Sequence, residues 1–188
     1  QLCTFVLSFL SAAILARYFD KQEYGTYKQI LYIYTTMQSL FTMGLPSAFA
    51  YFIPRMNANE QKSLVNGLTR IFLLLGVVFS LSLFFLAKSI WLNNPELAVG
   101  IKIFSPFPLF TIPAMGVEGI YTALKKTKSI AVYNIASKAM MLACIVIPVI
   151  VFHTTYRGAI LGWGAASFIT FLIAMYMKNK PYTKIKQE

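Results

Sequence analysis

Long apolar runs dominate the sequence and restrict its fold more than any other feature. Six runs approach the length that crosses a membrane: residues 2–16, 27–53, 68–87, 99–124, 130–152 and 158–177. A helix needs about 20 apolar residues to cross the hydrocarbon core of a bilayer. Backbone groups cannot bond to water in that core, so each run must satisfy its own groups as an α-helix. The sequence therefore predicts an all-α, polytopic transmembrane bundle of six membrane-spanning helices.

Composition excludes the other broad classes of protein. Apolar residues make up 57% of the chain and charged residues 12%, whereas a soluble domain averages about 25% charged residues. Disordered chains are poor in apolar residues and are excluded as well. The net charge of +11 comes from short basic clusters between the apolar runs. It does not form the basic face of a nucleic-acid binder. A transmembrane β-barrel would show alternating segments of about ten residues instead of continuous apolar runs.

The basic residues between the runs predict which side of the membrane each connection faces. One set of connections, together with the tail, holds ten basic residues: Arg55, Lys62, Arg70, Lys125, Lys126, Lys128, Lys178, Lys180, Lys184 and Lys186. The opposite set holds six: Arg17, Lys21, Lys28, Lys88, Lys102 and Arg157. Because short cytoplasmic loops are enriched in lysine and arginine, we expect both ends of the chain in the cytoplasm.

The predicted domain organisation is one bundle followed by a short polar segment. Residues 1–177 hold all six runs, and residues 178–188 form a polar cytoplasmic tail or a linker. The chain begins at Gln1 and enters an apolar run at once, so we expect residues before it and a truncated first helix.

The second run carries a polar stripe. Lys28, Tyr32, Thr35, Ser39 and Thr42 recur at the spacing that places side chains on one face of a helix. Polar side chains inside a membrane usually face a protein interior or water, so this face can line a watery cavity. Serine and threonine also form hydrogen bonds between helices, and the sequence leaves both interpretations open.

The fourth run combines an acidic residue with three prolines. Glu118 is the acidic residue placed clearly inside a run, where it can act in proton or cation coupling. It can equally reach water near the helix end or pair with Lys125. Pro106, Pro108 and Pro113 remove backbone donors and predict a kinked or broken helix.

The last two runs add a candidate cation and a packing signal. Asn134 and Lys138 lie one helical turn apart in the fifth run. Lys138 either extends its amine to the membrane surface or forms an anion site. Gly158, Gly162 and Gly164 in the sixth run predict close helix packing, since small residues let two backbones approach.

Signatures of catalysis, metal binding and cofactor binding are missing from the sequence. It has one histidine, His153, and two cysteines, Cys3 and Cys144, which lie inside apolar runs. There is no glycine-rich phosphate loop, so we do not expect the chain to bind ATP. Six scattered acidic residues provide no carboxylate pair for a divalent metal. We therefore predict that the protein is not an enzyme, with no catalytic residues, no metal and no cofactor.

Three local patterns resemble the polysaccharide-biosynthesis flippases of the multidrug/oligosaccharidyl-lipid/polysaccharide exporter superfamily. Residues 15–27 contain Ala-Arg followed by Glu-Tyr-Gly-x-Tyr, which looks like the first loop of that family. Residues 44–55 contain Gly-Leu-Pro followed by Phe-Ile-Pro-Arg, similar to the end of its second span. Residues 123–128, Ala-Leu-Lys-Lys-Thr-Lys, lead to Asn134 and are similar to its fourth loop. The spacing of all three agrees with the six predicted spans.

The resemblance implies a MATE-like fold of two six-helix bundles around a central cavity, with this chain as the N-terminal lobe. The implied cargo is a lipid-linked oligosaccharide, a repeat unit of the O-antigen or lipopolysaccharide type on an undecaprenyl-pyrophosphate carrier. The implied mechanism is alternating access, in which the two bundles rock about a central site. The implied location is the bacterial inner (cytoplasmic) membrane. The implied partners are the cargo, membrane lipids, and a second six-helix half in the same protein or in a partner chain.

An anionic pyrophosphate also implies cationic residues in the cavity, because arginine and lysine bind phosphate well. The cavity candidates are four cations and three residues of the polar stripe: Arg17, Lys28, Arg55, Lys138, Tyr32, Thr35 and Ser39. Arg17 and Arg55 fit equally well as anchors at the membrane interface. Glu118 is the candidate for ion coupling.

Two other functions remain open at this stage. A MATE-type, cation-coupled multidrug exporter would share the architecture but would need acidic residues in its cavity, and Glu118 is the one available. A non-transporting membrane scaffold would need no second six-helix half. The complete coding sequence separates a transporter from a scaffold, because a second bundle is expected in the transporter alone.

Overall fold

The computed structural model describes residues 2–182, with side chains from residue 5 onward. This part of the chain is helical throughout and contains no strand, which confirms the predicted all-α class. The α-helices are α1 (Leu2–Tyr18), α2 (Lys21–Thr42), α3 (Leu45–Phe52), α4 (Ala58–Ile90), α5 (Pro95–Phe104), α6 (Pro108–Ala114), α7 (Val117–Ala123), α8 (Thr127–Phe152) and α9 (Tyr156–Asn179). Two short 3-10 helices, η1 (Ile53–Arg55) and η2 (Lys180–Tyr182), follow α3 and α9. Residues 183–188 of the predicted tail lie outside the described residues.

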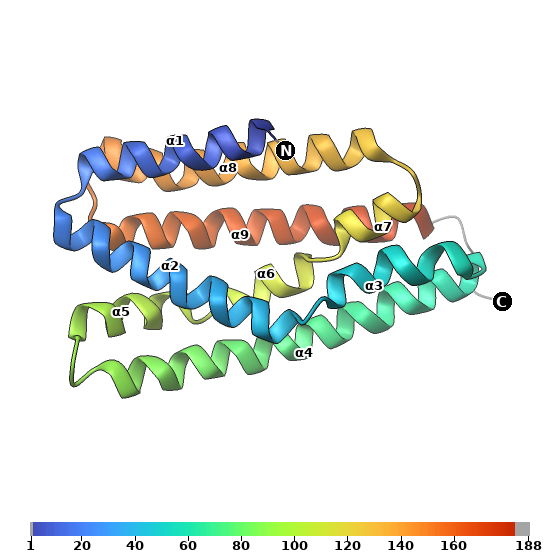
Figure 1. The fold of residues 1–188 in the computed structure, drawn as a ribbon, viewed down its shortest axis with the longest axis horizontal. Helices are drawn as coiled ribbons and strands as arrows, with labels where there is room; N and C mark the ends of the chain where they lie inside the picture. The colour runs from blue at the N-terminus through green and yellow to red at the C-terminus, as the bar shows by residue number, and fades with distance from the viewer. Residues whose placement is uncertain (1, 183–188) are drawn as a thin grey trace.

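The long helices run side by side (Figure 1). α1 packs on α8, α8 packs on α9, and α4 packs along α5 and α6. α6 also contacts α9, so the broken segment from α5 to α7 connects the two sides of the bundle. α2 crosses the broken segment and contacts α4, α5 and α9.

Three helices in the described part of the chain are long and apolar enough to cross a membrane. They are α4, α8, and α9 with its extension to Tyr182. The bent pair formed by α5 and residues 108–123 makes a fourth if it counts as one span, with an angle of 50° between its halves. α1 is apolar but shorter. α2 contains the polar stripe and is not among the helices that are long and apolar enough to cross a membrane. On length and composition, the structure therefore supports three or four of the six predicted spans.

Polar residues begin several helices. The carboxylate of Asp20 accepts a hydrogen bond of 2.7 Å from the backbone N–H of Glu23 at the start of α2. Asn57 and Glu60 form a reciprocal capping box at the start of α4. Such caps satisfy amide groups that have no partner inside the helix. Partial burial, together with the charge of Asp20, raises the pKa of Glu23 above its usual value.

The fourth run is broken, as its prolines predict, and its residues belong to three helices, α5, α6 and α7. Pro108 begins α6, and Pro113 lies inside the last turn of that helix. Gly116 then adopts a left-handed conformation, with φ of +91°, before α7 begins. A Cβ atom added at Gly116 would lie 2.1 Å from the ring of Phe49. Both the backbone conformation and the available space therefore require glycine here.

The second run is also broken, which the sequence analysis did not predict. The sequence predicts one membrane-spanning helix over residues 27–53, but α2 ends at Thr42 and α3 begins at Leu45. Met43 and Gly44 have φ values of 40° and 76°. The N–H of Met43 still bonds to the carbonyl oxygen of Ser39 at 3.2 Å. A left-handed glycine after the last turn is a common way to end a helix.

An aromatic cluster joins the broken segment to the long helices. Tyr34 of α2 lies 5.4 Å from Phe79 of α4, 4.7 Å from Phe104 of α5 and 5.2 Å from Trp163 of α9, measured between ring centres. The Tyr34 hydroxyl also forms a hydrogen bond with Thr111 of α6. One side chain of α2 thus contacts four other helices, which fixes the rotation of α2 about its own axis.

Gly162 provides the close approach between α8 and α9. A Cβ atom added there would lie 1.9 Å from the carbonyl oxygen of Cys144, a backbone atom of α8. The predicted packing role is therefore confirmed for Gly162. The other two glycines of the signal contact different neighbours: Gly158 lies against the side chain of Thr154, and Gly164 lies against the ring of Phe107.

We predict that Gly162→Ala destabilises the protein, because the added methyl group would overlap a backbone atom that can move only with its helix. Overpacking of this kind lowers the free energy of unfolding by about 1–3 kcal/mol. The melting temperature of the detergent-purified protein checks this. Gly67→Ala is the control, since Gly67 lies in α4 with open space around its Cβ position. Equal melting temperatures for the two variants would contradict the prediction.

Candidate functional site

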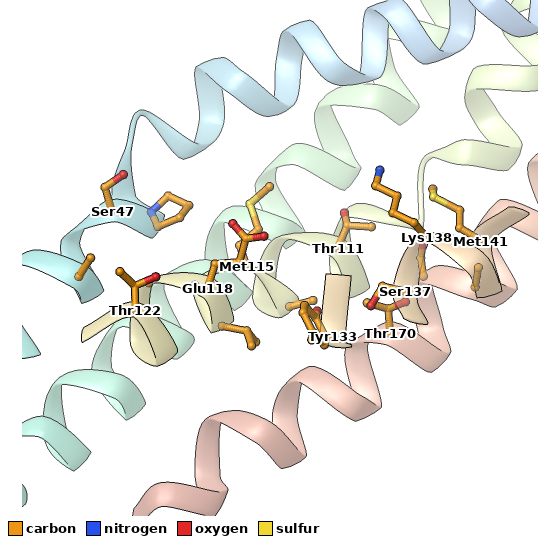
Figure 2. Close-up of a pocket in the computed structure, with 18 of the residues that line it drawn as sticks. Ser47, Thr111, Met115, Glu118, Thr122, Tyr133, Ser137, Lys138, Met141 and Thr170 are labelled. Carbon is orange, nitrogen blue, oxygen red and sulfur yellow. The ribbon is translucent and has the colours of Figure 1, made fainter. Parts of the chain in front are cut away.

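A cavity of about 560 Å³ lies between α3, α6, α7, α8 and α9. Figure 2 shows its labelled side chains reaching in from several helices that are distant in the sequence. Its lining combines apolar groups with a carboxylate, an amine and several hydroxyls: Pro46, Ser47, Ala50, Thr111, Ala114, Met115, Gly116, Val117, Glu118, Gly119, Thr122, Tyr133, Ser137, Lys138, Met141, Trp163, Ala166, Ser167 and Thr170.

The break between α6 and α7 forms one wall of this cavity. Ala114 ends α6, Met115 is extended, and Gly116 turns the chain into α7. A straight helix would turn successive side chains around its axis, whereas the break presents these three consecutive residues to the same space. Gly119 of α7 packs closely on α3, because a Cβ atom there would lie 2.7 Å from the carbonyl oxygen of Pro46.

Glu118 and Lys138 both line the cavity, one from α7 and the other from α8. The Glu118 carboxylate accepts a hydrogen bond from the side-chain amide of Asn134, one turn before Lys138 in α8. The sequence left Glu118 to reach water, to pair with Lys125 or to act in ion coupling. The structure shows a hydrogen bond to Asn134, which fixes the carboxylate at the cavity wall.

The hydroxyl groups of the cavity are partly occupied by internal bonds. Ser167 donates to the carbonyl oxygen of Trp163 at 2.8 Å, and Thr111 bonds to Tyr34. Within the described residues, no group of histidine, cysteine, aspartate and glutamate side chains could hold a metal ion. The cavity can therefore offer a carboxylate to a cation and an amine to an anion on a mainly apolar surface.

The stripe residues of α2 lie apart from this cavity. Lys28, Tyr32, Thr35 and Ser39 are exposed, and α2 contributes none of the described lining residues. The hydroxyls of Thr35 and Ser39 donate to backbone carbonyls of their own helix at 3.0 and 2.9 Å. The amine of Lys28 lies 5.3 Å from the ring centre of Tyr24. These residues form a separate polar face.

Arg17 lies in the last turn of α1, and Arg55 lies in η1, which directly follows α3. Figure 1 shows that α1 and α3 end at opposite ends of the bundle. Both arginines are exposed. The guanidinium of Arg55 lies 3.7 Å from the ring centre of Tyr51 and donates to the Tyr51 carbonyl oxygen at 2.9 Å. The structure therefore does not bring the seven predicted cavity residues into one site. It places Lys138 in the cavity with Glu118, four residues on the α2 face, and two arginines at the ends.

Lys178 is a residue whose position the sequence analysis did not foresee. It was placed at the start of a polar tail, but α9 continues to Asn179 and the Lys178 side chain is only 1% exposed. Its amine donates to the carbonyl oxygen of Pro113 at 2.6 Å. It also lies 5.4 and 5.5 Å from the ring centres of Phe49 and Phe72. Lys178 thus satisfies a carbonyl left open at the α6–α7 break, next to the cavity wall.

A signal for this burial was present in the sequence. The buried stripe of α9 recurs at helical spacing and includes Lys178 as its last member: Tyr156, Ile160, Trp163, Ser167, Ala174 and Lys178. A lysine in phase with a buried stripe is therefore expected to turn inward and to need a hydrogen-bond acceptor.

The comparison with protein families agrees with this geometry. The model of a family described as polysaccharide biosynthesis protein matches residues 1–187, nearly the whole chain. The chain belongs to the polysaccharide biosynthesis protein family. Members of this family are generally transporters or flippases rather than enzymes, and the apolar helices together with the family indicate a membrane protein. No curated protein and no solved structure matches the chain.

We predict that Lys178→Ala destabilises this polysaccharide biosynthesis protein. The substitution removes a buried side chain and leaves the Pro113 carbonyl without its partner, which costs about 2–4 kcal/mol of unfolding free energy. Thermal unfolding in detergent checks this. Lys125→Ala removes the same charge from an exposed loop position and should leave the melting temperature nearly unchanged. A Lys178→Ala variant as stable as the control would contradict the structural role.

Proposed function

We propose that the protein translocates a lipid-linked oligosaccharide across the bacterial inner membrane by alternating access. The carrier is an undecaprenyl-pyrophosphate type lipid and the sugar is a polysaccharide repeat unit. The proposal rests on the family, which has a transporter or flippase role in polysaccharide synthesis, and on one structural observation. That observation is the exposed polar face of α2.

The α2 face is unusual for a helix in an apolar bundle. Tyr32 is 72% exposed, and Lys28, Thr35 and Ser39 are exposed beside it. Contact with lipid would be costly for the lysine, so such a face belongs against water or against another part of the protein. The contacts of Tyr34 on the other side of α2 prevent the helix from turning this face inward. A second six-helix half facing α2, in the same protein or in a partner chain, would enclose a watery cavity between the two halves.

We further propose that the chain crosses the membrane six times. α4, α8 and α9 cross as single helices, and the broken segment α5–α7 crosses as one. α1, and α2 with α3, would supply the other two crossings, because they lie alongside the apolar helices (Figure 1). The distribution of basic residues then places both chain ends in the cytoplasm. In this arrangement Arg55 lies at the cytoplasmic end and Lys28 lies within the α2 face.

The proposed role of the cations is to contact the pyrophosphate of the carrier at successive points along its path, since they do not lie in one site. Lys28 faces the proposed central cavity, Lys138 lies in the cavity of the bundle, and Arg17 and Arg55 stand at the two ends. Tyr32, Thr35 and Ser39 would contribute polar contacts to the cargo. Charge-assisted hydrogen bonds from lysine and arginine to phosphate are stronger than neutral ones, so the loss of two should reduce transport measurably.

We predict that the double variant Lys28→Ala and Arg55→Ala, in the intact protein, exports less surface polysaccharide at normal protein levels. A loss of about tenfold or more would follow from the removal of two charge-assisted contacts. The readout is the amount of polysaccharide at the cell surface. Lys21→Ala with Lys125→Ala is the control, since it removes two exposed lysines outside the proposed cavity. Normal export by the Lys28/Arg55 variant would count against the cationic cavity.

A second candidate function, cation-coupled export of drug-like molecules, is favoured by Glu118. Its carboxylate lines the cavity and accepts a hydrogen bond from Asn134.

We predict that Glu118→Gln abolishes the dependence of transport on a cation gradient if Glu118 is the coupling group, because the amide cannot take up a proton or balance a cation. Transport assays with and without a proton or sodium gradient check this. Unchanged gradient dependence in Glu118→Gln would remove Glu118 from coupling.

A non-transporting scaffold is the remaining alternative. It is distinguished by the complete coding sequence, in which a second six-helix bundle would support the transporter.

A further inference from the structure

A second hollow, of about 680 Å³, lies on the bundle where α7, the start of α8 and the end of α9 meet. We call it the basic groove. Its lining combines three lysines with aromatic, apolar and small polar side chains: Tyr121, Lys126, Lys128, Ser129, Val132, Tyr133, Ala136, Ser137, Ile173, Tyr176, Met177, Lys180 and Pro181. No step of the proposed transport uses it.

One end of the basic groove is strongly positive. Lys126 precedes α8, Lys128 lies in its first turn, and Lys180 comes from the end of α9. No aspartate or glutamate is found among the described residues that line the groove. The groove can therefore attract an anion over a broad patch.

The start of α8 strengthens this positive end. Its cap residue, Lys126, makes no side-chain capping bond, and the first turn contains no acidic residue. Free N–H groups at a helix start carry partial positive charge, so a lysine there is unfavourable unless an anion is close by. An anionic ligand in the groove would neutralise both the lysines and the helix end.

The other end of the basic groove is apolar and faces outward. Val132 is 67% exposed and Ile173 is 39% exposed, and Tyr176, which is 65% exposed, links the two ends because its ring centre lies 5.8 Å from the amine of Lys180. Val132 belongs to α8, and the other two belong to α9, both of which are apolar enough to cross a membrane. Tyrosine is common at the membrane interface, where its ring contacts lipid and its hydroxyl contacts water. Hydrocarbon chains are the surroundings that suit this surface.

We propose that the basic groove binds an anionic glycerophospholipid of the surrounding leaflet. The headgroup phosphate contacts Lys126, Lys128 and Lys180, and an acyl chain lies along Val132 and Ile173. Charge complementarity selects an anionic headgroup, and the apolar continuation selects a ligand with hydrocarbon attached to its phosphate. The proposal requires a membrane location but not a transport function, so it can hold even if the protein is not a flippase.

Native mass spectrometry of the delipidated, full-length protein tests the proposal with two probes, dioleoyl-phosphatidylglycerol and dioleoyl-phosphatidylcholine. The groove variant carries Lys126→Gln, Lys128→Gln and Lys180→Gln. The control variant carries Lys21→Gln, Arg70→Gln and Lys125→Gln, which removes the same charge outside the groove. Each lysine near a membrane surface contributes enough attraction that the groove variant should bind phosphatidylglycerol at least about tenfold more weakly than wild type. The control should bind it like wild type, and phosphatidylcholine should bind all three proteins weakly.

Two further measurements test the role of charge in lipid binding: lysine-to-arginine variants and a salt titration. If the groove variant does not fold, lysine-to-arginine changes at the same three positions should retain binding, and rising ionic strength should release phosphatidylglycerol from wild type. Equal phosphatidylglycerol binding by wild type and the groove variant, or salt-independent binding, would overturn the proposal. Retention of a polyprenyl pyrophosphate or of inorganic pyrophosphate in preference to phosphatidylglycerol would also overturn it, because the groove would then serve the carrier or a soluble anion.

Discussion

Three prolines and Gly116 prevent residues 99–124 from forming one straight helix, and much of the bundle is arranged around this break. A broken helix in a membrane leaves backbone carbonyls that need partners, since no water is present to supply them. Here the partner for Pro113 is the buried amine of Lys178, from the far end of α9. The left-handed turn at Gly116 in addition creates the space that Phe49 fills. The break thus holds α3, α7 and α9 together and shapes the cavity that contains Glu118.

The polar groups of the bundle are divided between two settings with different physical consequences. Tyr34 and Thr111 are buried or partly buried and bond to each other between α2 and α6, so they specify helix packing, whereas the buried Ser167 bonds within its own helix, α9. Lys28 and Tyr32 lie on the other side of α2 and remain exposed. A buried polar group with a hydrogen-bond partner inside the protein helps to specify one structure. A polar group exposed on the surface of an apolar bundle is stable only against water or another protein surface. This division is the reason that the proposed function rests first on the exposed face of α2.

The sequence predicted those features that depend on local chemistry. Apolar length and proline positions predicted the all-α class and the broken fourth run, and glycine spacing predicted the tight contact at Gly162. The contact partners were not predictable, because they depend on packing between residues far apart in the chain. The hydrogen bond of Glu118 with Asn134 joins α7 to α8, and Lys178 meets Pro113 across 65 positions. The break at Met43 and Gly44 was missed because a single glycine in an apolar run is also compatible with a continuous helix.

The lysines that contribute to the net charge of +11 lie in surroundings that differ in burial and polarity. Lys178 is buried, so a carbonyl and two aromatic rings must replace its hydration, and its removal disturbs the fold. Lys28 is exposed on a polar face, where we propose that it contacts the cargo. The lysines of the basic groove stand beside an exposed apolar surface, where water and hydrocarbon meet. Salt screens exposed charges far more than buried ones. Burial therefore separates the lysine that stabilises the fold from the exposed lysines, which we propose bind anionic ligands, and the polar or apolar surface beside each exposed lysine distinguishes its proposed ligand.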